Sequence, residues 1–109
     1  MQVMITKKYV GITDIMSNFL KKTVAVAVAS AEEGTTKTQL ARSIYNAIQR
    51  KWGRNDYWNV IVASTPEFGE GNDVWGSYVT MDEHKYIKLQ LGDKLYFEIW
   101  KGSSRRTNK

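Results

Sequence analysis

The chain has 109 residues, of which 42% are hydrophobic, and it contains no cysteine. This length fits one domain with a modest buried core, and the lack of cysteine excludes a disulfide framework and a thiolate metal site. Sixteen Lys and Arg against eleven Asp and Glu leave a net charge of +5. A basic balance suits an acidic partner, nucleic acid or a membrane surface. Because these cations are scattered along the chain, we interpret them as a solvated surface.

The sequence carries no signal for a membrane. Its longest apolar run, Thr23–Ala31, is far too short to cross a bilayer. The N-terminus also lacks the layout of a signal peptide, because Lys21 and Lys22 precede this run only well inside the chain. We therefore expect a cytoplasmic protein with no membrane span.

The N-terminal third predicts a short strand followed by a helix. Val3 and Ile5 alternate with polar neighbours, and Thr13 or Asp14 is a suitable N-cap. The segment Ile15–Glu33 then fits two patterns, because an apolar stripe has helical spacing whereas three valines alternating with alanines also fit a buried strand. Its length, its alanines and a glycine stop signal favour the helix. The stripe comprises Met16, Leu20, Val24, Ala27, Val28 and Ala31, and the stop is Gly34.

A second helix is clearer. Thr36 and Gln39 form a capping-box pattern, in which each side chain bonds the backbone N–H of the other residue. An apolar stripe with a spacing near 3.6 follows, and Gly53 ends the pattern. The stripe comprises Leu40, Ala41, Ile44, Ile48 and Trp52.

Cations and aromatic residues interleave at the end of this helix. Such a composition can grip phosphate and stack on bases. It equally suits a helix C-terminus, where cations meet the negative end of the dipole, followed by core aromatics. We favour the structural interpretation, because Trp52 completes the helical stripe and Trp58 begins a strand pattern. The residues are Arg50, Lys51, Trp52, Arg54, Tyr57 and Trp58.

Four strands are predicted after the second helix. The first begins with the alternation of Trp58, Val60 and Val62, and the loop Ser64–Asp73 follows it. Val74–Thr80 comes next and holds two small residues, Gly76 and Ser77, which often mark the close approach of another backbone. Lys85–Leu91 and Leu95–Lys101 alternate cleanly around a tight turn at Gly92 and Asp93. In these two strands we expect a buried face and a wetter face, the wetter one carrying Tyr86, Lys88, Gln90, Tyr96, Glu98 and Trp100.

The predicted order, strand, helix, helix and four strands, indicates an α+β fold with two helices packed on an antiparallel sheet. We expect one domain over residues 1–102 and a mobile basic tail over residues 103–109, which has no apolar residue. An edge strand open to another backbone would allow peptide binding by strand addition.

Catalytic and metal sites are weakly supported. His84 is the only histidine, and we expect it in a surface turn; Ser77 nearby shows no spacing of a triad. One histidine without cysteine does not supply the usual zinc ligands. Glu67, Glu70 and Asp73 do not match a calcium-binding loop. We expect no enzymatic activity, no cofactor and no metal.

Four short strings carry a resemblance to a known family: Trp75-Gly76-Ser77-Tyr78-Val79-Thr80, Tyr86-Ile87, Leu91-Gly92 and Trp100-Lys101-Gly102. They resemble the end of the eight-kilodalton cytoplasmic dynein light chains, and Gly-Ser-Tyr-Val-Thr is the specific part. A weaker similarity extends from about Met16 to Gly102. Related domains also occur at the C-terminal end of calcium-binding tegumental proteins of parasitic flatworms.

The resemblance implies a strand-swapped homodimer. In that family the segment corresponding to Trp75–Thr80 crosses to a second subunit and joins its sheet, so that two sheets pack across a two-fold axis. A groove between each swapped strand and the second helix binds extended segments of client proteins by strand addition. The implied function is a non-enzymatic adaptor or hub in the cytoplasm, associated with the cytoskeleton and a microtubule motor. The dynein intermediate chain is one implied partner.

The resemblance also implies site residues. Lys37 and Thr38 correspond to positions where backbone groups cap a client glutamine, and Tyr86 takes the place of a groove-lining aromatic residue. Lys88 and Gln90 replace the usual aromatics, which makes the groove more polar and cationic. The peptide-binding set is Lys37, Thr38, Trp75, Gly76, Ser77, Tyr78, Val79, Thr80, Tyr86 and Lys88.

The implied dimer interface comprises Asn59, Ser77, Tyr78 and Val79. Asn59 replaces an interface histidine of the family, so we expect no pH switch of dimerisation at that position.

Three alternatives stay open. The chain can belong to the flatworm tegumental branch, with the same fold and partners other than the motor. It can be a basic nucleic-acid-binding protein, which would show steep salt dependence. It can also be a purely structural dimer without an open groove.

Overall fold

The structure is a computed structural model, and it describes residues 2–53, 58–64 and 81–102. These residues form two helices and a four-stranded antiparallel sheet, so the predicted α+β class is confirmed. The predicted strand Val74–Thr80, most of the loop Ser64–Asp73 and the tail lie outside the described residues. The elements are β1 (Val3–Lys8), α1 (Asp14–Ser30), α2 (Lys37–Trp52), β2 (Trp58–Ala63), β3 (Met81–Leu91) and β4 (Leu95–Gly102).

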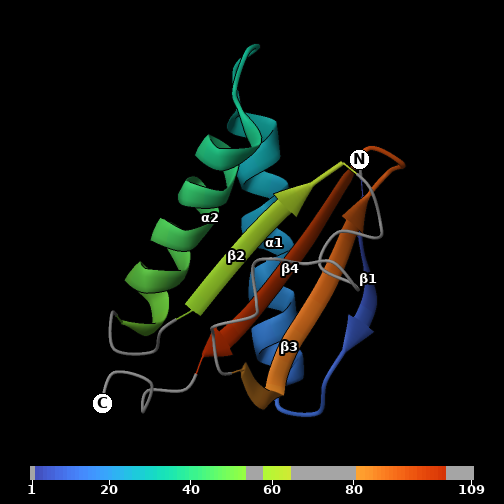
Figure 1. The fold of residues 1–109 in the computed structure, drawn as a ribbon, viewed down its shortest axis with the longest axis vertical. Coiled ribbons are helices and arrows are strands. Elements are labelled where there is room, and N and C mark those ends of the chain that lie inside the picture. The colour runs from blue at the N-terminus through green and yellow to red at the C-terminus, as the bar shows by residue number, and fades with distance from the viewer. Residues whose placement is uncertain (1, 54–57, 65–80, 103–109) are drawn as a thin grey trace.

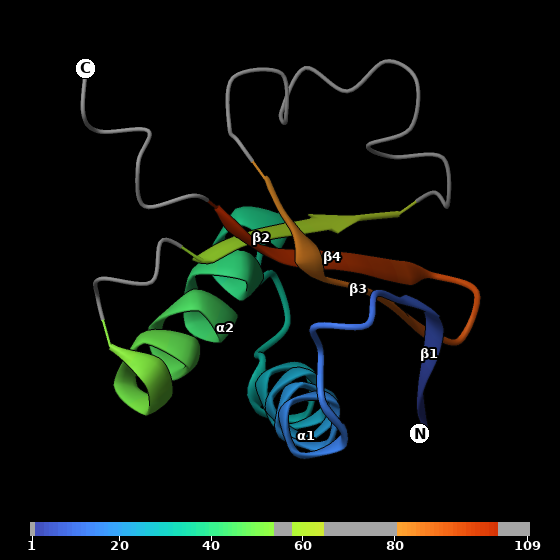
Figure 2. The same ribbon diagram turned by 90° about the horizontal axis from the view of Figure 1, so that it is seen from below.

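The sheet has the strand order β1-β3-β4-β2, with the hairpin β3–β4 at its centre (Figure 1). In this hairpin Ile87 lies opposite Ile99, and Leu89 lies opposite Phe97. The turn at Gly92 is confirmed, and its φ of +61° is a conformation that glycine adopts at little cost. Both helices lie on the same side of the sheet (Figure 2). The sheet therefore has an inner face toward the helices and an outer face away from them.

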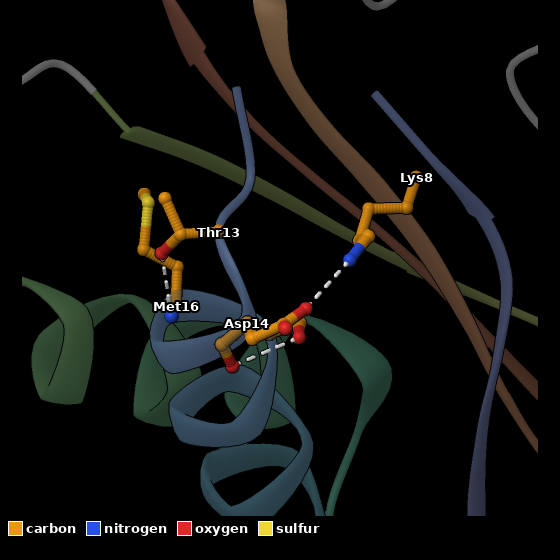
Figure 3. A network of polar contacts seen from close by, with 5 residues as sticks. Lys8, Thr13, Asp14 and Met16 are labelled. Atoms are coloured by element: carbon orange, nitrogen blue, oxygen red, sulfur yellow. Dashed lines mark hydrogen bonds and ion pairs between the residues drawn. The ribbon is translucent and has the colours of Figure 1, made fainter. Parts of the chain in front are cut away.

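The ambiguous N-terminal segment is a helix, so the strand alternative for its valines is wrong. Thr13 is the N-cap, and its hydroxyl accepts a hydrogen bond of 3.1 Å from the Met16 N–H (Figure 3). Lys8 reaches Asp14 in the first turn at 3.4 Å, which ties β1 to α1 (Figure 3). Val24 is completely buried, whereas Val26 is 55% exposed. Neighbouring valines with such different exposure show the helical period.

The end of α1 differs from the prediction. We expected the helix to continue to Glu33, with Gly34 as its stop, but it ends at Ser30, and Ala31 is already extended. Residues after the helix form a turn of their own, because the Thr35 N–H and hydroxyl both donate to the Glu32 carbonyl, at 3.0 and 2.7 Å. Gly34 takes its positive φ of +94° inside this turn. It therefore shapes the connection between the helices rather than the helix end.

The predicted capping box of α2 is confirmed. The Gln39 N–H donates to the Thr36 hydroxyl at 3.0 Å, and the Thr36 N–H donates to the Gln39 side chain at 2.9 Å. The helix ends at Trp52, and Gly53 follows with a φ of +95°. Both boundaries agree with the sequence signals because each depends only on residues within one turn.

The main core lies between the two helices and the inner face of the sheet. Trp52 stands between Phe19 and Trp58, with ring centroids 5.0 Å apart in each pair. These contacts confirm that Trp52 and Trp58 have a structural role, whereas Arg54 and Tyr57 lie outside the described residues. The buried members are Val3, Ile12, Leu20, Val24, Leu40, Ile44, Ile48, Trp58, Val62, Ile87, Leu89, Leu91, Phe97 and Ile99.

The strand β3 begins earlier than predicted. We expected His84 in a turn, but the backbone is already a strand from Met81, so that expectation is wrong. The reason is that β4 continues to Gly102, which pairs with Met81. The register is irregular between Met81 and Tyr86, as at a bulge. The polar stretch that indicated a turn is thus part of an irregular strand.

Candidate functional site

The predicted site residues fall in two separate regions of the described chain. Tyr86 and Lys88 lie on the outer face of the sheet, because they alternate with the core residues Ile87 and Leu89 of β3. Lys37 and Thr38 lie at the start of α2, on the helix side. The region around Tyr86 and Lys88 is called the outer face cluster here, and it comprises Ile61, Tyr86, Lys88, Glu98 and Trp100.

The apolar members of the outer face cluster are buried. The exposed fractions of Ile61, Tyr86 and Trp100 are 7%, 8% and 5%. Tyr9, which follows β1, packs its ring 4.9 Å from the Tyr86 ring. The ammonium group of Lys7 lies 5.6 and 6.0 Å from the centroids of these two rings, within the range of a cation–π contact. The sheet therefore has a second small core on the side away from the helices.

Polar groups are built into the same cluster. The Tyr86 hydroxyl donates to Oε2 of Glu98 at 2.8 Å, and the Lys88 ammonium group lies 3.7 Å from the same oxygen. The side chains of Lys88 and Glu98 are only 14% and 10% exposed. A buried ion pair needs such additional hydrogen bonds to offset its lost hydration. The cluster is thus a satisfied polar centre among large apolar side chains.

Strand register arranges the outer face in rows across the sheet. Asn59, Trp100 and Tyr86 are successive partners across β2, β4 and β3. Ile61, Glu98 and Lys88 form the next row. Asn59, the predicted interface residue, therefore lies beside the most buried part of the cluster. The indole N–H of Trp100 is buried and has no hydrogen-bond acceptor within the described part of the chain.

A separate hollow of about 510 Å³ opens at the start of α2. Val28, Lys37, Thr38, Leu40 and Leu95 are among the residues that line it. The first N–H groups of a helix have no acceptor within the helix. The capping box uses the N–H groups of Thr36 and Gln39 and leaves those of Lys37 and Thr38 outside it. The hollow thus presents the backbone N–H groups of Lys37 and Thr38 beside apolar side chains such as Leu40 and Leu95.

One chain does not bring the two groups of predicted site residues together. Lys37 and Thr38 share their hollow with Leu95, an inner-face neighbour of the core, whereas Tyr86 and Lys88 lie across the sheet from it. The remaining predicted site residues, Trp75, Gly76, Ser77, Tyr78, Val79 and Thr80, lie outside the described residues. Their assignment stays a prediction.

The expectation of a wetter outer face is wrong for its central residues. Glu98 and Trp100 are 8% and 5% exposed, and Ile61 on β2 is equally buried. The sequence analysis placed none of these three residues in a functional site. A signal was present, because this face of β4 carries two aromatic residues, Tyr96 and Trp100, and a solvated face seldom needs such large apolar side chains.

Comparison of the sequence with protein-family models and with curated proteins finds no match. Of the helices in the described ranges, none is long and apolar enough to cross a membrane. Within residues 2–53, 58–64 and 81–102, no three acidic, histidine or cysteine residues gather in a way that would hold a metal ion.

Proposed function

We propose that this protein is a homodimeric adaptor of the dynein light chain type, which performs no chemistry and binds extended peptide segments. One observation carries the proposal: the sheet has a buried cluster of Ile61, Tyr86 and Trp100 on its outer face. Both described helices lie on the inner side, so neither covers this cluster (Figure 2). Large aromatic side chains in a well-packed apolar centre are characteristic of protein interfaces. In the proposed dimer a second subunit packs its own sheet against this face and extends the apolar cluster, which one chain already buries in part with its own Tyr9.

The chain topology supports the same proposal. Residues 65–80, which hold the Gly-Ser-Tyr-Val-Thr string, connect β2 to β3. Within the described sheet β2 is an edge strand, and α2 packs against it. In the proposed dimer the segment Trp75–Thr80 crosses to the partner and adds to its sheet beside β2. An added strand at this edge would lie next to α2 and form one wall of a peptide groove.

The start of α2 would form the specific end of that groove. The N–H groups of Lys37 and Thr38 lie outside the capping box and can donate to a client side chain. Tyr86 and Lys88 lie on the other face of the same chain. In this proposal the two sets meet only when two subunits contribute them to one groove, so dimerisation is a condition of binding.

A dimer with two grooves would hold two client chains side by side. A single groove that binds with micromolar affinity contributes about 8 kcal/mol. When the client is itself a dimer, its second segment binds intramolecularly, and the apparent affinity rises by about a hundredfold or more. The dynein intermediate chain is the proposed client if motor association is retained, which would place the protein in the cytoplasm on the cytoskeleton. Partners outside the motor correspond to the tegumental branch.

The test measures mass in solution and peptide capture together. At micromolar concentration we expect the wild type to have twice the 12.5 kDa mass of one chain and to capture extended segments from a peptide array. The substitution Gly76→Trp would place a large side chain in the proposed added strand, so it is expected to abolish capture while the dimer persists. Gly71→Trp, outside that strand, is the matched control. A monomeric wild type, or a dimer without any extended motif on the array, would contradict the proposal.

A further inference from the structure

A groove between the two helices extends beyond the hollow at the start of α2 that the proposed adaptor function uses. Its volume is about 830 Å³, and it runs along α1 and α2. On α1 it is lined by Phe19, Lys22, Thr23, Val26, Ala27 and Ser30, and on α2 by Gln39, Arg42, Ser43, Asn46, Ala47 and Arg50. Both sets have the spacing i, i+3, i+4, i+7, i+8 and i+11, which is one face of a helix. Two helical stripes therefore form the walls.

The shape of the groove suits a helix. Each wall covers eleven residue steps, or about 16 Å at 1.5 Å per residue, which is three helical turns. Small side chains, including Ala27, Ser43 and Ala47, line the walls. Small residues let a third helix approach closely and insert its side chains into the groove. An extended strand would find no free backbone edge here, because both walls are helices.

Apolar side chains form part of the lining of the groove, and one of them is open to solvent. Val26 is 55% exposed within it, and Leu40 forms part of the lining. From Thr23 to Ser30 the helix α1 carries no charged residue. Part of this stretch packs in the core, as Val24 and Val28 do, whereas Val26 is an exposed apolar side chain that lines the groove.

The charge of the rim identifies the kind of partner. Three cations, Lys22, Arg42 and Arg50, line the groove, and the acidic residue among its lining residues is Glu32. None of the three cations forms an ion pair with another residue that the structure describes. Arg42 and Arg50 lie eight residues apart on α2, about 12 Å along the axis. Carboxylates two turns apart on a guest helix match this spacing.

Other occupants fit less well. A second copy that docks groove to groove is disfavoured, because it would set Lys22, Arg42 and Arg50 of one copy against the same cations of the other. Nucleic acid requires a dense row of cations along its phosphates, whereas the middle of this groove is occupied by Val26 and small residues.

We propose that the groove between α1 and α2 binds an acidic amphipathic helix of a partner protein. The guest would place small and medium apolar residues on Val26 and Ala47, and carboxylates at positions i and i+8 beside Arg42 and Arg50. This second site is formed by helix surfaces of one chain and needs neither Trp75–Thr80 nor a second subunit. It shares the lining residues Ala31, Glu32, Thr35 and Leu40 with the hollow at the start of α2.

The probe for this proposal is a designed helical peptide of about 18 residues, long enough to form a helix in water with Ala-rich sequence. It carries an Ala and Leu stripe with Glu at i and i+8, and a matched peptide carries Lys at the same two positions. Fluorescence anisotropy measures the dissociation constant of each peptide. We expect the Glu peptide to bind the wild type at least about tenfold more tightly than the Lys peptide, since each reversed contact changes attraction into repulsion. The variant Arg42→Glu/Arg50→Glu is expected to reverse this preference.

A steric test locates the site. Ser43 and Asn18 are both exposed helix residues, but only Ser43 lines the groove. Ser43→Trp is expected to abolish binding of the Glu peptide, and Asn18→Trp to leave it unchanged, with circular dichroism showing that both variants are folded. The proposal is overturned if the Glu peptide does not bind, if both peptides bind equally, or if Ser43→Trp has no effect. It is also overturned if an oligonucleotide displaces the bound peptide as effectively as unlabelled peptide does. The oligomeric state is measured in parallel, because a monomer that still binds the peptide separates this site from the proposed adaptor function.

Discussion

The Tyr86 hydroxyl donates a hydrogen bond of 2.8 Å to Oε2 of Glu98 on the neighbouring strand. Lys88, directly opposite Glu98 in the register, lies 3.7 Å from the same oxygen. The three groups form a polar centre within the otherwise apolar outer face. A buried polar group that loses its partner costs free energy. Substitutions at this centre are therefore expected to lower the free energy of unfolding even when they preserve the size of the side chain.

Replacing Tyr86 by phenylalanine removes only the hydroxyl group. Because this hydroxyl donates to a buried carboxylate, we expect Tyr86→Phe to lower the free energy of unfolding by about 2 kcal/mol, the range for a hydrogen bond to a charged group. Urea denaturation measures the loss. Tyr45→Phe is the control, since the Tyr45 hydroxyl accepts from Gln49 in a partly buried place, and we expect it to lose less than about 1 kcal/mol. Equal losses in the two variants would show that the hydroxyl of Tyr86 has no special role.

The ion pair between Lys88 and Glu98 is expected to matter more when one member is removed than when both are replaced. Glu98→Leu leaves the buried ammonium group without this carboxylate and should destabilise the chain by about 3 kcal/mol. The double variant Lys88→Met/Glu98→Leu replaces both charges by apolar groups. It should lose less than Glu98→Leu, about 2 kcal/mol, because the Tyr86 hydroxyl still lacks its acceptor. A thermodynamic cycle from denaturation curves tests this. Additive losses in the double variant would contradict a coupled pair.

The turn between β3 and β4 makes a sharp test of backbone conformation. Gly92 has a φ of +61°, and no atom lies within 4 Å of the position that a Cβ would take. Any cost of substitution therefore arises from the backbone alone. We expect Gly92→Ala to lower the free energy of unfolding by about 1 kcal/mol, and Gly92→Asn to lower it less, because asparagine tolerates the left-handed region. Thermal unfolding of both variants measures the two losses of stability. A smaller loss for Gly92→Ala than for Gly92→Asn would contradict a left-handed backbone conformation at this position.

A charge on the outer face is expected to separate the proposed subunits. Ile61 is 7% exposed and lies in the same row as Glu98 and Lys88. Ile61→Glu adds a second carboxylate beside Glu98, so we expect the mass in solution at micromolar concentration to fall from that of the proposed dimer to that of one chain, and the chain to lose stability as well. Sedimentation measures the mass.

The matched control for this change is Asn46→Glu, which adds the same charge to an exposed position of α2. We expect it to leave the mass unchanged. Persistence of the dimer in Ile61→Glu would exclude the outer face as the subunit interface.

Local signals predicted the helices well and some boundaries poorly. The capping box of Thr36 and Gln39 placed the start of α2 correctly, because both hydrogen bonds join residues three positions apart. The end of α1 was misplaced, because Gly34 serves a turn around Glu32 that a stop signal does not distinguish from a helix end. His84 was assigned to a turn because its neighbours are polar, whereas the length of β4 decides that Met81 pairs with Gly102.

The candidate site was only partly accessible to sequence reasoning. Alternation correctly placed Tyr86 and Lys88 on the face opposite Ile87. It did not predict that Glu98 and Trp100 on this face are buried, because a period of two shows which residues share a face and not what covers that face.

By itself the sequence determined the second helix and its caps, the alternation of the strands and the hairpin at Gly92, and it favoured the first helix over a strand. Each of these signals depends on residues within a few positions of one another. Only the tertiary structure decided the strand order β1-β3-β4-β2, the polar centre of Tyr86, Lys88 and Glu98, and the groove between α1 and α2. These features join residues that are distant in the chain. Their geometry follows from how the helices and strands pack together, which no local pattern contains.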